Sequence, residues 1–441
     1  MNSTSIYKNY FKVHFFVLTC LGIELKPMKG SIANFIYKIY AVMIFTVVYL
    51  YFPYSEILSL VYEENFESAI YNLAFLLTQI LGLIKISLIL IYKKKIRMFC
   101  KFIETPPFLP DQNRSGEAEF LYVKEAIRAC NTQGYIFYGL TAGIISQMMY
   151  DALSNPGYTK CFVDSATNIT ITKHIRALPF NSKLPFETID SPYYEIACIY
   201  GSLSGAIFGY SVGAMDAIIC GIMCHIRAQL LILQECLKTF IPRGIYQMRE
   251  NVKLTNNDQK LLQSITNNLN ETIEIPNTLQ KYVHIAVCNI ITHHQKIIKL
   301  AQDAEELFSP LMLVQFLFSL GILCFQLFQL SITDIESVHF FGMSSYLILM
   351  LFQIYLFCYR GNEIMLHSHN ITDAVFESLW FLTDLKTQKL LLIMMIRACR
   401  PIKMTAGKFV FLSLEAFVSI VRGSGSYFMV LKNTNAPATE L

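Results

Sequence analysis

The strongest constraint on the fold of this chain is a series of seven apolar stretches, each close to the length that a helix needs to cross a membrane. They cover residues 34–52, 70–92, 134–153, 194–223, 307–331, 342–359 and 409–431. A helix of about 20 apolar residues spans the hydrocarbon core and satisfies its own backbone hydrogen bonds there. Charged residues make up only 15% of the 441 positions, which favours the membrane class. The sequence therefore predicts an all-α membrane protein with seven transmembrane helices.

The basic residues predict how these helices are oriented. Of the 36 lysine and arginine residues, 28 lie in the first 33 residues or in the connections after the second, fourth and sixth stretches. The connections after the first and fifth stretches hold none. Because positively charged connections stay on the cytoplasmic side, we expect a cytoplasmic N-terminus and an extracellular C-terminus. This orientation is the reverse of that of a G-protein-coupled receptor.

Helical periodicity between the stretches predicts that some connections are themselves helical and form a cytoplasmic anchor between subunits. The predicted regions are a cytoplasmic N-terminal arm with a candidate re-entrant segment (1–33), transmembrane segments 1–4 (34–223), a cytoplasmic helical anchor (224–306), segments 5–6 (307–359), further cytoplasmic anchor helices (360–408), segment 7 (409–431) and a short extracellular tail (432–441).

Two ionisable residues lie inside the predicted membrane segments at similar depths. Lys85 precedes the basic run that begins at Lys93 by eight residues, and Asp216 precedes Arg227 by eleven. An unpaired charge in the membrane is costly and usually has a partner. We expect a salt bridge between Lys85 and Asp216; the alternative is that each is hydrated separately.

Segment 4 carries four glycines at intervals of four residues, Gly201, Gly205, Gly209 and Gly213, which places them on one helix face. Such a face permits close packing of another helix. The alternative interpretation is that the missing side chains leave room for a ligand.

The last apolar stretch is unusually polar for a segment of its length, since Ser413, Glu415, Ser419 and Arg422 interrupt it. A helix that faces lipid on all sides does not tolerate such residues, whereas one that faces water or other helices does. The sequence therefore predicts a pore-lining or bundle-centre helix rather than a simple membrane anchor.

The sequence offers few candidates for metal-binding, catalytic or modification sites. The pairs His293-His294 and His367-x-His369 have no carboxylate or cysteine at ligand spacing, so we expect no metal. No nucleophile–base arrangement or phosphate loop is present, which predicts a protein that is not an enzyme, uses no cofactor and binds no nucleic acid. The sequon at Asn168 lies in a predicted extracellular loop, where glycosylation is expected.

Several motifs in the last third of the chain resemble those of the insect odorant receptor family. They are Cys358-Tyr359-Arg360-Gly361-Asn362-Glu363, Ala374-Val375-Phe376-Glu377-Ser378-Leu379-Trp380, Met404-Thr405-Ala406-Gly407-Lys408-Phe409, Leu412-Ser413-Leu414-Glu415-Ala416-Phe417 and Ser426-Tyr427-Phe428-Met429-Val430-Leu431.

The resemblance implies a ligand-gated, non-selective cation channel in the plasma membrane of a sensory neuron. Four subunits would surround one pore, and odorant-specific subunits of this family assemble with a shared co-receptor. The co-receptor carries an insertion between segments 4 and 5 that this chain lacks, and Ser426 and Asn433 depart from the pattern of gustatory receptors. We therefore expect an odorant-specific subunit whose partners are a small volatile ligand, the co-receptor, the lipid bilayer and permeant cations. The alternatives are a metabotropic seven-helix chemoreceptor, which the inverted orientation disfavours, and a transporter, which the lack of internal repeats disfavours.

The resemblance also implies where the ligand and the gate lie. In the family, the outer halves of segments 2, 3, 4 and 6 hold the odorant. The candidate ligand-binding residues there are Phe75, Thr78, Gln79, Ser146, Gln147, Tyr150, Tyr200, Ser204, Phe208, Tyr346 and Met350. A mixture of aromatic and aliphatic residues with a few hydroxyls and amides predicts an ester, alcohol or terpenoid. Val430 matches the valine that forms the narrowest ring of the pore, with Ser426 and Asn433 on either side of it.

Overall fold

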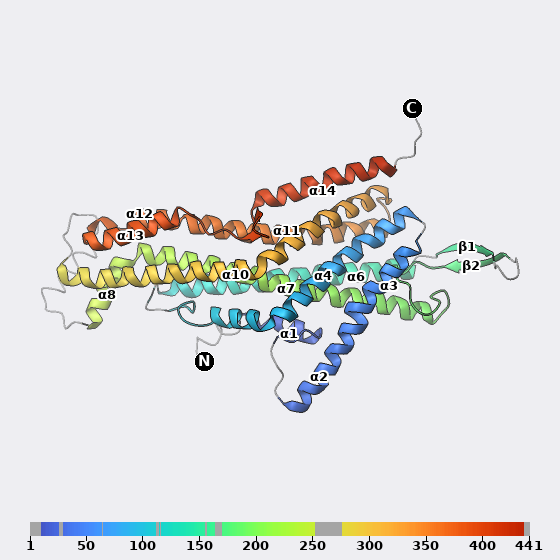
Figure 1. Ribbon diagram of the computed structural model, residues 1–441, viewed down its shortest axis with the longest axis horizontal. Helices are drawn as coiled ribbons and strands as arrows, with labels where there is room; N and C mark the ends of the chain where they lie inside the picture. The colour runs from blue at the N-terminus through green and yellow to red at the C-terminus, as the bar shows by residue number, and fades with distance from the viewer. Residues whose placement is uncertain are drawn as a thin grey trace.

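The protein is an elongated bundle of long helices. The computed structural model describes residues 10–25, 30–63, 65–111, 114, 116–154, 157–163, 170–251 and 276–435. In Figure 1 the long axis is horizontal; a β-hairpin projects from one end, and the short helices α8, α12 and α13 lie at the other. We call the half of the bundle toward the β1–β2 hairpin the hairpin half and the remainder the opposite half.

Helices account for most of the described chain. Their bounds are α1 (Lys12–Cys20), α2 (Ser31–Ile44), the π-helical segment η2 (Phe45–Leu50), α3 (Tyr51–Val61), α4 (Phe66–Ile103), α6 (Glu117–Ser154), α7 (Tyr193–Lys238), α8 (Phe240–Asn251), α10 (Asn277–Ile332), α11 (Val338–His369), α12 (Ile371–Phe376), the short 3₁₀ turn η3 (Trp380–Leu382), α13 (Leu385–Ala398) and α14 (Leu414–Asn435).

Side-chain caps fix where several of these helices begin. The side chain of Asn65 accepts a hydrogen bond from the backbone N–H of Glu67 at the start of α4, and that of Ser337 accepts one from Phe340 at the start of α11. Each cap satisfies a backbone donor that has no partner within the helix, which stabilises a helix by about 1 kcal/mol.

Five of the described helical stretches are long and apolar enough to cross a membrane: Ser31–Val61, Phe66–Ile103, Tyr193–Lys238, Asn277–Ile332 and Val338–Phe376. The prediction of a predominantly helical membrane protein is confirmed at this level. The remaining two predicted segments are helical as α6 and α14 but fall outside this group. In α14, Glu415, Arg422 and several serines and glycines lower the mean hydropathy.

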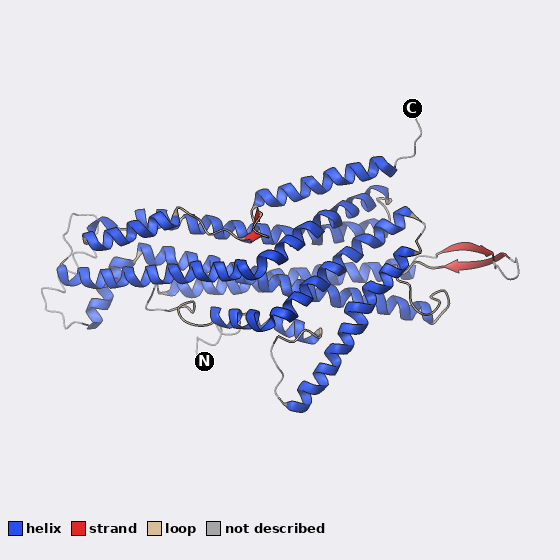
Figure 2. Ribbon diagram, viewed as in Figure 1, coloured by secondary structure: helices blue, strands red, loops and turns tan. Residues whose placement is uncertain are grey.

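Two small hairpins depart from the all-α prediction (Figure 2). Strands β1 (Tyr158–Val163) and β2 (Thr170–Ile175) pair antiparallel, with Tyr158 opposite Ile175. Strands β3 (Thr405–Ala406) and β4 (Val410–Phe411) form a second antiparallel pair directly before α14. The first hairpin lies in the connection between α6 and α7. The second falls in the predicted anchor helices (360–408) and at the start of predicted segment 7 (409–431), so the last helix begins at Leu414 rather than at Phe409.

Helix α7 forms the centre of the bundle. Every residue from Ser211 to Ile226 is buried, and α7 packs against α4, α6, α10 and α11. Its glycines, alanines and serines let these neighbours approach closely. Helix α7 also continues beyond the predicted end of segment 4 to Lys238, as α10 begins well before segment 5 at Asn277.

The β3–β4 hairpin fixes the starting point of α14 against α10. The backbone N–H of Gly407 donates to the carbonyl of Ser309 at 2.8 Å, immediately before Pro310 within α10. A Cβ at Gly407 would lie 2.5 Å from the side chain of Leu313, so only glycine fits there. From this point α14 runs along the outside of α10 and α11, at the upper edge of Figure 1.

Candidate ligand-binding site

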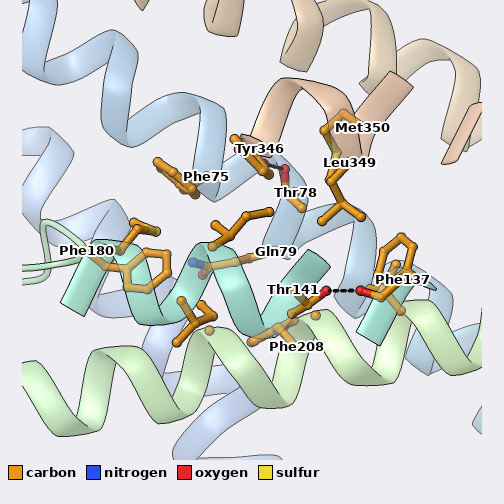
Figure 3. A pocket seen from close by; sticks show the side chains of 16 residues that line it. Phe75, Thr78, Gln79, Phe137, Thr141, Phe180, Phe208, Tyr346, Leu349 and Met350 are labelled. Atoms are coloured by element: carbon orange, nitrogen blue, oxygen red, sulfur yellow. Dashed lines mark hydrogen bonds between the residues drawn. The ribbon is translucent and has the colours of Figure 1, made fainter. Parts of the chain in front are cut away.

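The hairpin half contains an apolar cavity of about 80 Å³ between α4, α6, α7 and α11. Figure 3 shows its side chains converging from these four helices and from the loop after β2. Its wall is formed by Phe75, Thr78, Gln79, Phe137, Thr141, Ile144, Ile145, Met148, Phe180, Gly205, Phe208, Gly209, Val212, Tyr346, Leu349 and Met350.

The glycines of α7 admit the side chains that build part of this wall. A Cβ at Gly205 would lie 2.6 Å from the ring of Phe180, and one at Gly209 would lie 2.5 Å from Thr141. Real Cβ atoms do not approach so closely. The space at these glycines is filled by Phe180 and Thr141, so Gly205 and Gly209 serve close packing, and this packing positions part of the cavity wall.

Aromatic rings form one side of the cavity. The rings of Phe75 and Tyr346 are stacked with centroids 4.8 Å apart, and Phe180 meets Phe75 edge-on at 5.4 Å. The hydroxyl of Tyr346 is hydrogen-bonded to that of Thr78. Such arrangements offer a flat apolar surface for a small ligand and hold the rings in place.

The wall includes Gln79, whose side-chain amide is hydrogen-bonded to a residue outside the wall. The Nε2 of Gln79 donates a hydrogen bond of 2.6 Å to Oε1 of Glu56, a completely buried residue of α3. Glu56 lies between the predicted segments 34–52 and 70–92, and its burial was not predicted.

Six of the predicted ligand-binding residues line the cavity and five do not. Those in the wall are Phe75, Thr78, Gln79, Phe208, Tyr346 and Met350. Ser146 and Tyr150 are instead exposed, with 61% of Tyr150 accessible. Tyr200 donates through its hydroxyl to the carbonyl of Val47, away from the cavity. Ser204 is buried outside the wall, and Gln147 donates to the carbonyl of Val338 and lines a different cavity.

The residues predicted on segment 3 lie on a different face of α6 from the one that lines the cavity. The cavity is lined there by Phe137, Thr141, Ile144 and Met148. These four recur at intervals of three or four residues, the spacing of one helix face, so the apolar periodicity would have located them. Phe180 comes from an irregular loop, and no local signal in the sequence indicates its role.

A second, larger cavity lies nearer the hairpin end. It measures about 750 Å³ and shares Met148 with the apolar cavity. In its wall, Nδ1 of His339 is hydrogen-bonded to Oδ2 of Asp151 at 3.2 Å. The ring of His339 also lies 5.4 Å from that of Tyr71.

On the other side of the apolar cavity, buried polar side chains link four helices. Nζ of Lys85 on α4 lies 2.7 Å from Oδ1 of Asp216 on α7, and both side chains are buried. Gln353 on α11 donates to the second carboxylate oxygen of Asp216. Gln315 on α10 donates to Gln353 at 3.1 Å. The network therefore ties α4, α7, α11 and α10 together at one level of the bundle.

Helix α14 has one packed face and one exposed face. Ala416, Ile420 and Ser424, at intervals of four, are buried against the bundle. The predicted pore residues Ser426, Val430 and Asn433 lie on the exposed face, with 64% of Val430 accessible. Glu415, Ser419 and Arg422 are exposed as well.

Two further predictions concern bound groups. Among the residues that the structure describes, no group of three or more histidine, cysteine, aspartate or glutamate side chains is placed to hold a metal ion. The predicted glycosylation site, Asn168, lies outside the described residues.

Fold and site together define a multi-pass helical membrane protein that encloses a small apolar cavity. A family model described as "7tm Odorant receptor" matches residues 65–425. The chain belongs to the insect odorant receptor family.

Individual relatives match over shorter regions. Odorant receptor 94a of Drosophila melanogaster is 30% identical over 148 residues, which cover 33% of this chain and 38% of that protein. Odorant receptor Or1 of Anopheles gambiae is 24% identical over 264 residues, covering 58% and 60%. The insect olfactory receptor OR5 from Machilis hrabei, solved in complex with eugenol, superposes with a TM-score of 0.74 at 16% identity, over 98% of this chain and all of the other. This likeness shows a shared fold.

Proposed function

We propose that the protein is an odorant-binding subunit of a ligand-gated, non-selective cation channel. The observation that carries the proposal is the combination of an apolar cavity in the hairpin half with a helix, α14, whose polar face is exposed in the part of the chain that the structure describes. A cavity alone would fit any small-ligand receptor. An exposed row of Glu415, Ser419, Arg422 and Ser426 on a membrane helix calls for water or another subunit beside it.

The proposed topology follows the distribution of basic residues. Seven helical spans cross the plasma membrane with the N-terminus inside and the C-terminus outside, so that the hairpin half faces the exterior. The proposed arrangement keeps the predicted regions: spans 1–4, the anchor helices of 224–306 and 360–408, spans 5–6, and the pore helix. The family membership and the five long apolar helices support it.

The opposite half is proposed to join subunits. Helix α13 buries Leu391, Met394 and Met395 against the bundle, but Leu392, Ile393 and Ile396 on its outer side are more than half exposed. An apolar face on a helix that lies outside the membrane favours association with another chain. We propose that this face contributes to a heterotetramer with the shared co-receptor.

The ligand is proposed to be a small volatile molecule that occupies the apolar cavity. Its wall is built from rings and aliphatic side chains with few polar atoms, which excludes ions and sugars. The eugenol complex of the structural relative supports a small organic ligand for this fold. Ligand binding opens the channel only if the open state binds the ligand more tightly than the closed state. We propose that the difference arises from the shape of the cavity, whose walls move with α11 and, through the buried network, with α10.

The gate is proposed to be a ring of Val430 side chains contributed by α14 of each subunit, with Ser426 and Asn433 lining the path on either side. A ring of branched apolar side chains closes a narrow pore by excluding water. Replacing Val430 with serine should raise the current without odorant or alter ion permeability, measured in cells that also express the co-receptor. Val418→Ser, an exposed valine three turns earlier on α14, is the matched control. Unchanged resting currents and selectivity in Val430→Ser cells would contradict the gate assignment.

A further inference from the structure

The apolar cavity and the larger cavity of about 750 Å³ are neighbours, and the proposed function uses only the apolar one. Met148 on α6 belongs to the walls of both. The aromatic side chains around the apolar cavity, such as Phe75, Phe208 and Tyr346, are buried. A ligand therefore reaches this cavity only when part of its wall moves, and the route depends on which part is held least firmly.

A short piece of the loop after β2 runs between the two cavities. Ala177, Leu178, Pro179 and Asn181 line the larger cavity, whereas Phe180 lines the apolar one. Figure 3 shows the ring of Phe180 at one edge of the apolar cavity. Because neighbouring residues of one segment face different cavities, residues 177–181 form part of the wall that separates them. We call the side chains of Phe180 and Met148 the partition.

The two ends of this segment are attached to the bundle. At one end, the guanidinium carbon of Arg176 lies 5.3 Å from the ring centroid of Tyr194 on α7, and the hydroxyl of Tyr194 donates to the carbonyl of Ala177 at 3.1 Å. At the other end, the backbone N–H of Lys183 donates to the carbonyl of Ser55 on α3 at 3.0 Å. A cation–π contact and backbone hydrogen bonds thus hold both ends in place.

The middle of the segment is held by weaker contacts. The hydroxyl of Tyr71 lies 3.5 Å from the carbonyl oxygen of Pro179, and Nδ2 of Asn181 lies 3.3 Å from Oγ of Ser68. Both contacts are longer than ordinary hydrogen bonds, which weaken as the distance grows. The residues around Phe180 can therefore shift while the attached ends stay where they are.

The partition itself consists of side chains that are free to change rotamer. The ring of Phe180 meets Phe75 and Phe52 edge-on, with centroids 5.4 and 5.5 Å away. Met148 has an unbranched side chain, which adapts to different spaces. The larger cavity next to them has room to receive both side chains.

The wall between α6 and α7 is closed by backbone packing instead. A Cβ at Gly209 would lie 2.5 Å from Thr141, and one at Gly213 would lie 2.3 Å from Phe137. Helices packed so closely separate only if whole elements move, which is slower than a change of side-chain rotamer. The partition is therefore the easier way into the apolar cavity.

We propose that the larger cavity is the entrance through which a small neutral ligand reaches the apolar cavity, and that Phe180 and Met148 turn toward the larger cavity to admit it. The proposed topology places this entrance on the extracellular side. The inference rests on the proposed ligand-binding function of the apolar cavity, but it does not require the channel mechanism. The competing route leads from the lipid between two helices, and it bypasses both the larger cavity and the partition.

The test measures how fast a small neutral reagent reaches the apolar cavity. Leu349, which lines that cavity, is replaced with cysteine in the full-length protein, and the purified variant is exposed to methyl methanethiosulfonate. Mass spectrometry of the peptide that contains position 349 gives the rate of thiol modification. Every further variant carries Leu349→Cys as well, so the rates compare access to the same thiol.

Truncating the partition should speed up the modification. Phe180→Ala and Met148→Ala should each raise the rate by about tenfold, because less side chain has to move before the two cavities join. Ile144→Ala is the matched control, since Ile144 lies one turn before Met148 on α6 and lines the apolar cavity but not the larger one. It should leave the rate within about twofold of the starting value.

Filling the larger cavity should have the opposite effect. Gly342 lines this cavity, and a Cβ there would meet only ordinary contacts, the nearest 3.7 Å away in Gln147. Gly342→Trp should lower the rate by about tenfold, a change that a loosened fold cannot imitate. Gly143→Trp is the control, because Gly143 is exposed on α6 and a Cβ there would meet nothing within 4 Å.

The outcomes decide between the two routes. A rate that Gly342→Trp leaves unchanged would overturn the inference and favour entry from the lipid. An equal acceleration by Ile144→Ala and Met148→Ala would overturn it as well, since general loosening would then explain the access. The same holds if the introduced thiol is not modified in any variant. Odorant-evoked currents are recorded separately, so a failed access test with intact currents leaves the proposed channel function standing.

Discussion

The two halves of the bundle differ in packing, and α7 passes through both. In the hairpin half, from Tyr193 to Tyr210, buried positions of the helix are separated by partly or fully exposed ones. The apolar cavity lies beside this part of α7, and the cavity of about 750 Å³ lies nearer the hairpin end. From Ser211 to Ile226 every side chain is buried. Close-packed segments move as units, whereas a wall with cavities can change shape locally. We propose that a ligand reshapes the hairpin half while the opposite half moves without deforming.

The boundary between the halves is where the buried polar network lies. Lys85, Asp216, Gln353 and Gln315 belong to four different helices and are joined side chain to side chain. Phe137 lines the apolar cavity and also a small space next to Asp216, so the two features adjoin. We propose that a movement of the cavity wall reaches α10, against which α14 packs.

The largest expected effect is the loss of stability when the buried Lys85–Asp216 pair is broken. Lys85→Met or Asp216→Leu leaves one buried charge without a partner, and each should lower the stability by about 3–5 kcal/mol. The double variant removes both charges and should recover much of the loss. Thermal unfolding of the purified protein and the amount at the cell surface measure the effect. Single variants that behave like the wild type, or a double variant no better than the singles, would show that the pair does not hold the boundary.

Two leucine substitutions, one in each half of the bundle, test whether the halves differ in packing and in ligand response. Leu233 is fully buried in the opposite half, and Leu349 lines the apolar cavity. Leu233→Ala should cost between about 2 and 5 kcal/mol without moving the odorant dose–response curve. Leu349→Ala enlarges a space that already exists, so its cost should lie at the low end of that range while the curve shifts. Thermal midpoints and half-maximal odorant concentrations are measured for both. The reverse assignment of the two effects would contradict the division into halves.

Acidification is expected to weaken the opposite half by a smaller amount. Burial lowers the pKa of His225 to about 3 and that of His294 to about 4, and it lowers the pKa of His293 as well. In the unfolded chain these groups titrate near 6.5. Between about pH 6.5 and 4 the unfolded state binds more protons, so the free energy of unfolding falls as the pH drops through this range.

The expected loss is on the order of 1 kcal/mol for each buried histidine at about pH 5.5. Thermal midpoints recorded from about pH 7.5 to 5.5 measure it. His225→Gln should reduce the slope, and His369→Gln, an exposed position, serves as its control. If the midpoint stays constant over this range, or if the two substitutions have equal effects, the buried histidines do not cause the expected loss of stability.

The sequence predicted those parts of the molecule that local pattern determines. Hydrophobic length identified the helical membrane class, and the matching depths of Lys85 and Asp216 predicted a salt bridge, which the structure contains at 2.7 Å. The cavity faces of α4 and α11 followed from residues such as Phe75 and Tyr346, because on these helices the polar and aromatic side chains share the inward face.

The parts that the sequence did not reveal depend on contacts between distant segments. On α6 the predicted residues Ser146 and Tyr150 are exposed, whereas Thr141, on another face of the same helix, lines the cavity. Phe180 reaches the cavity only because Gly205 lets it approach. Glu56 lies between two predicted segments, and only the packing of α3 against α4 shows that it is buried.

The most direct test of the central claim compares two tyrosines of the hairpin half. Tyr346 lines the apolar cavity, while Tyr150 is exposed on the neighbouring helix α6. Both are replaced with alanine, and the odorant dose–response curve is recorded with the co-receptor present. If the cavity holds the ligand, Tyr346→Ala shifts the half-maximal concentration by about tenfold or more, which corresponds to about 1.4 kcal/mol, and Tyr150→Ala leaves it unchanged. A shift of equal size in both variants, or in neither, would contradict the account.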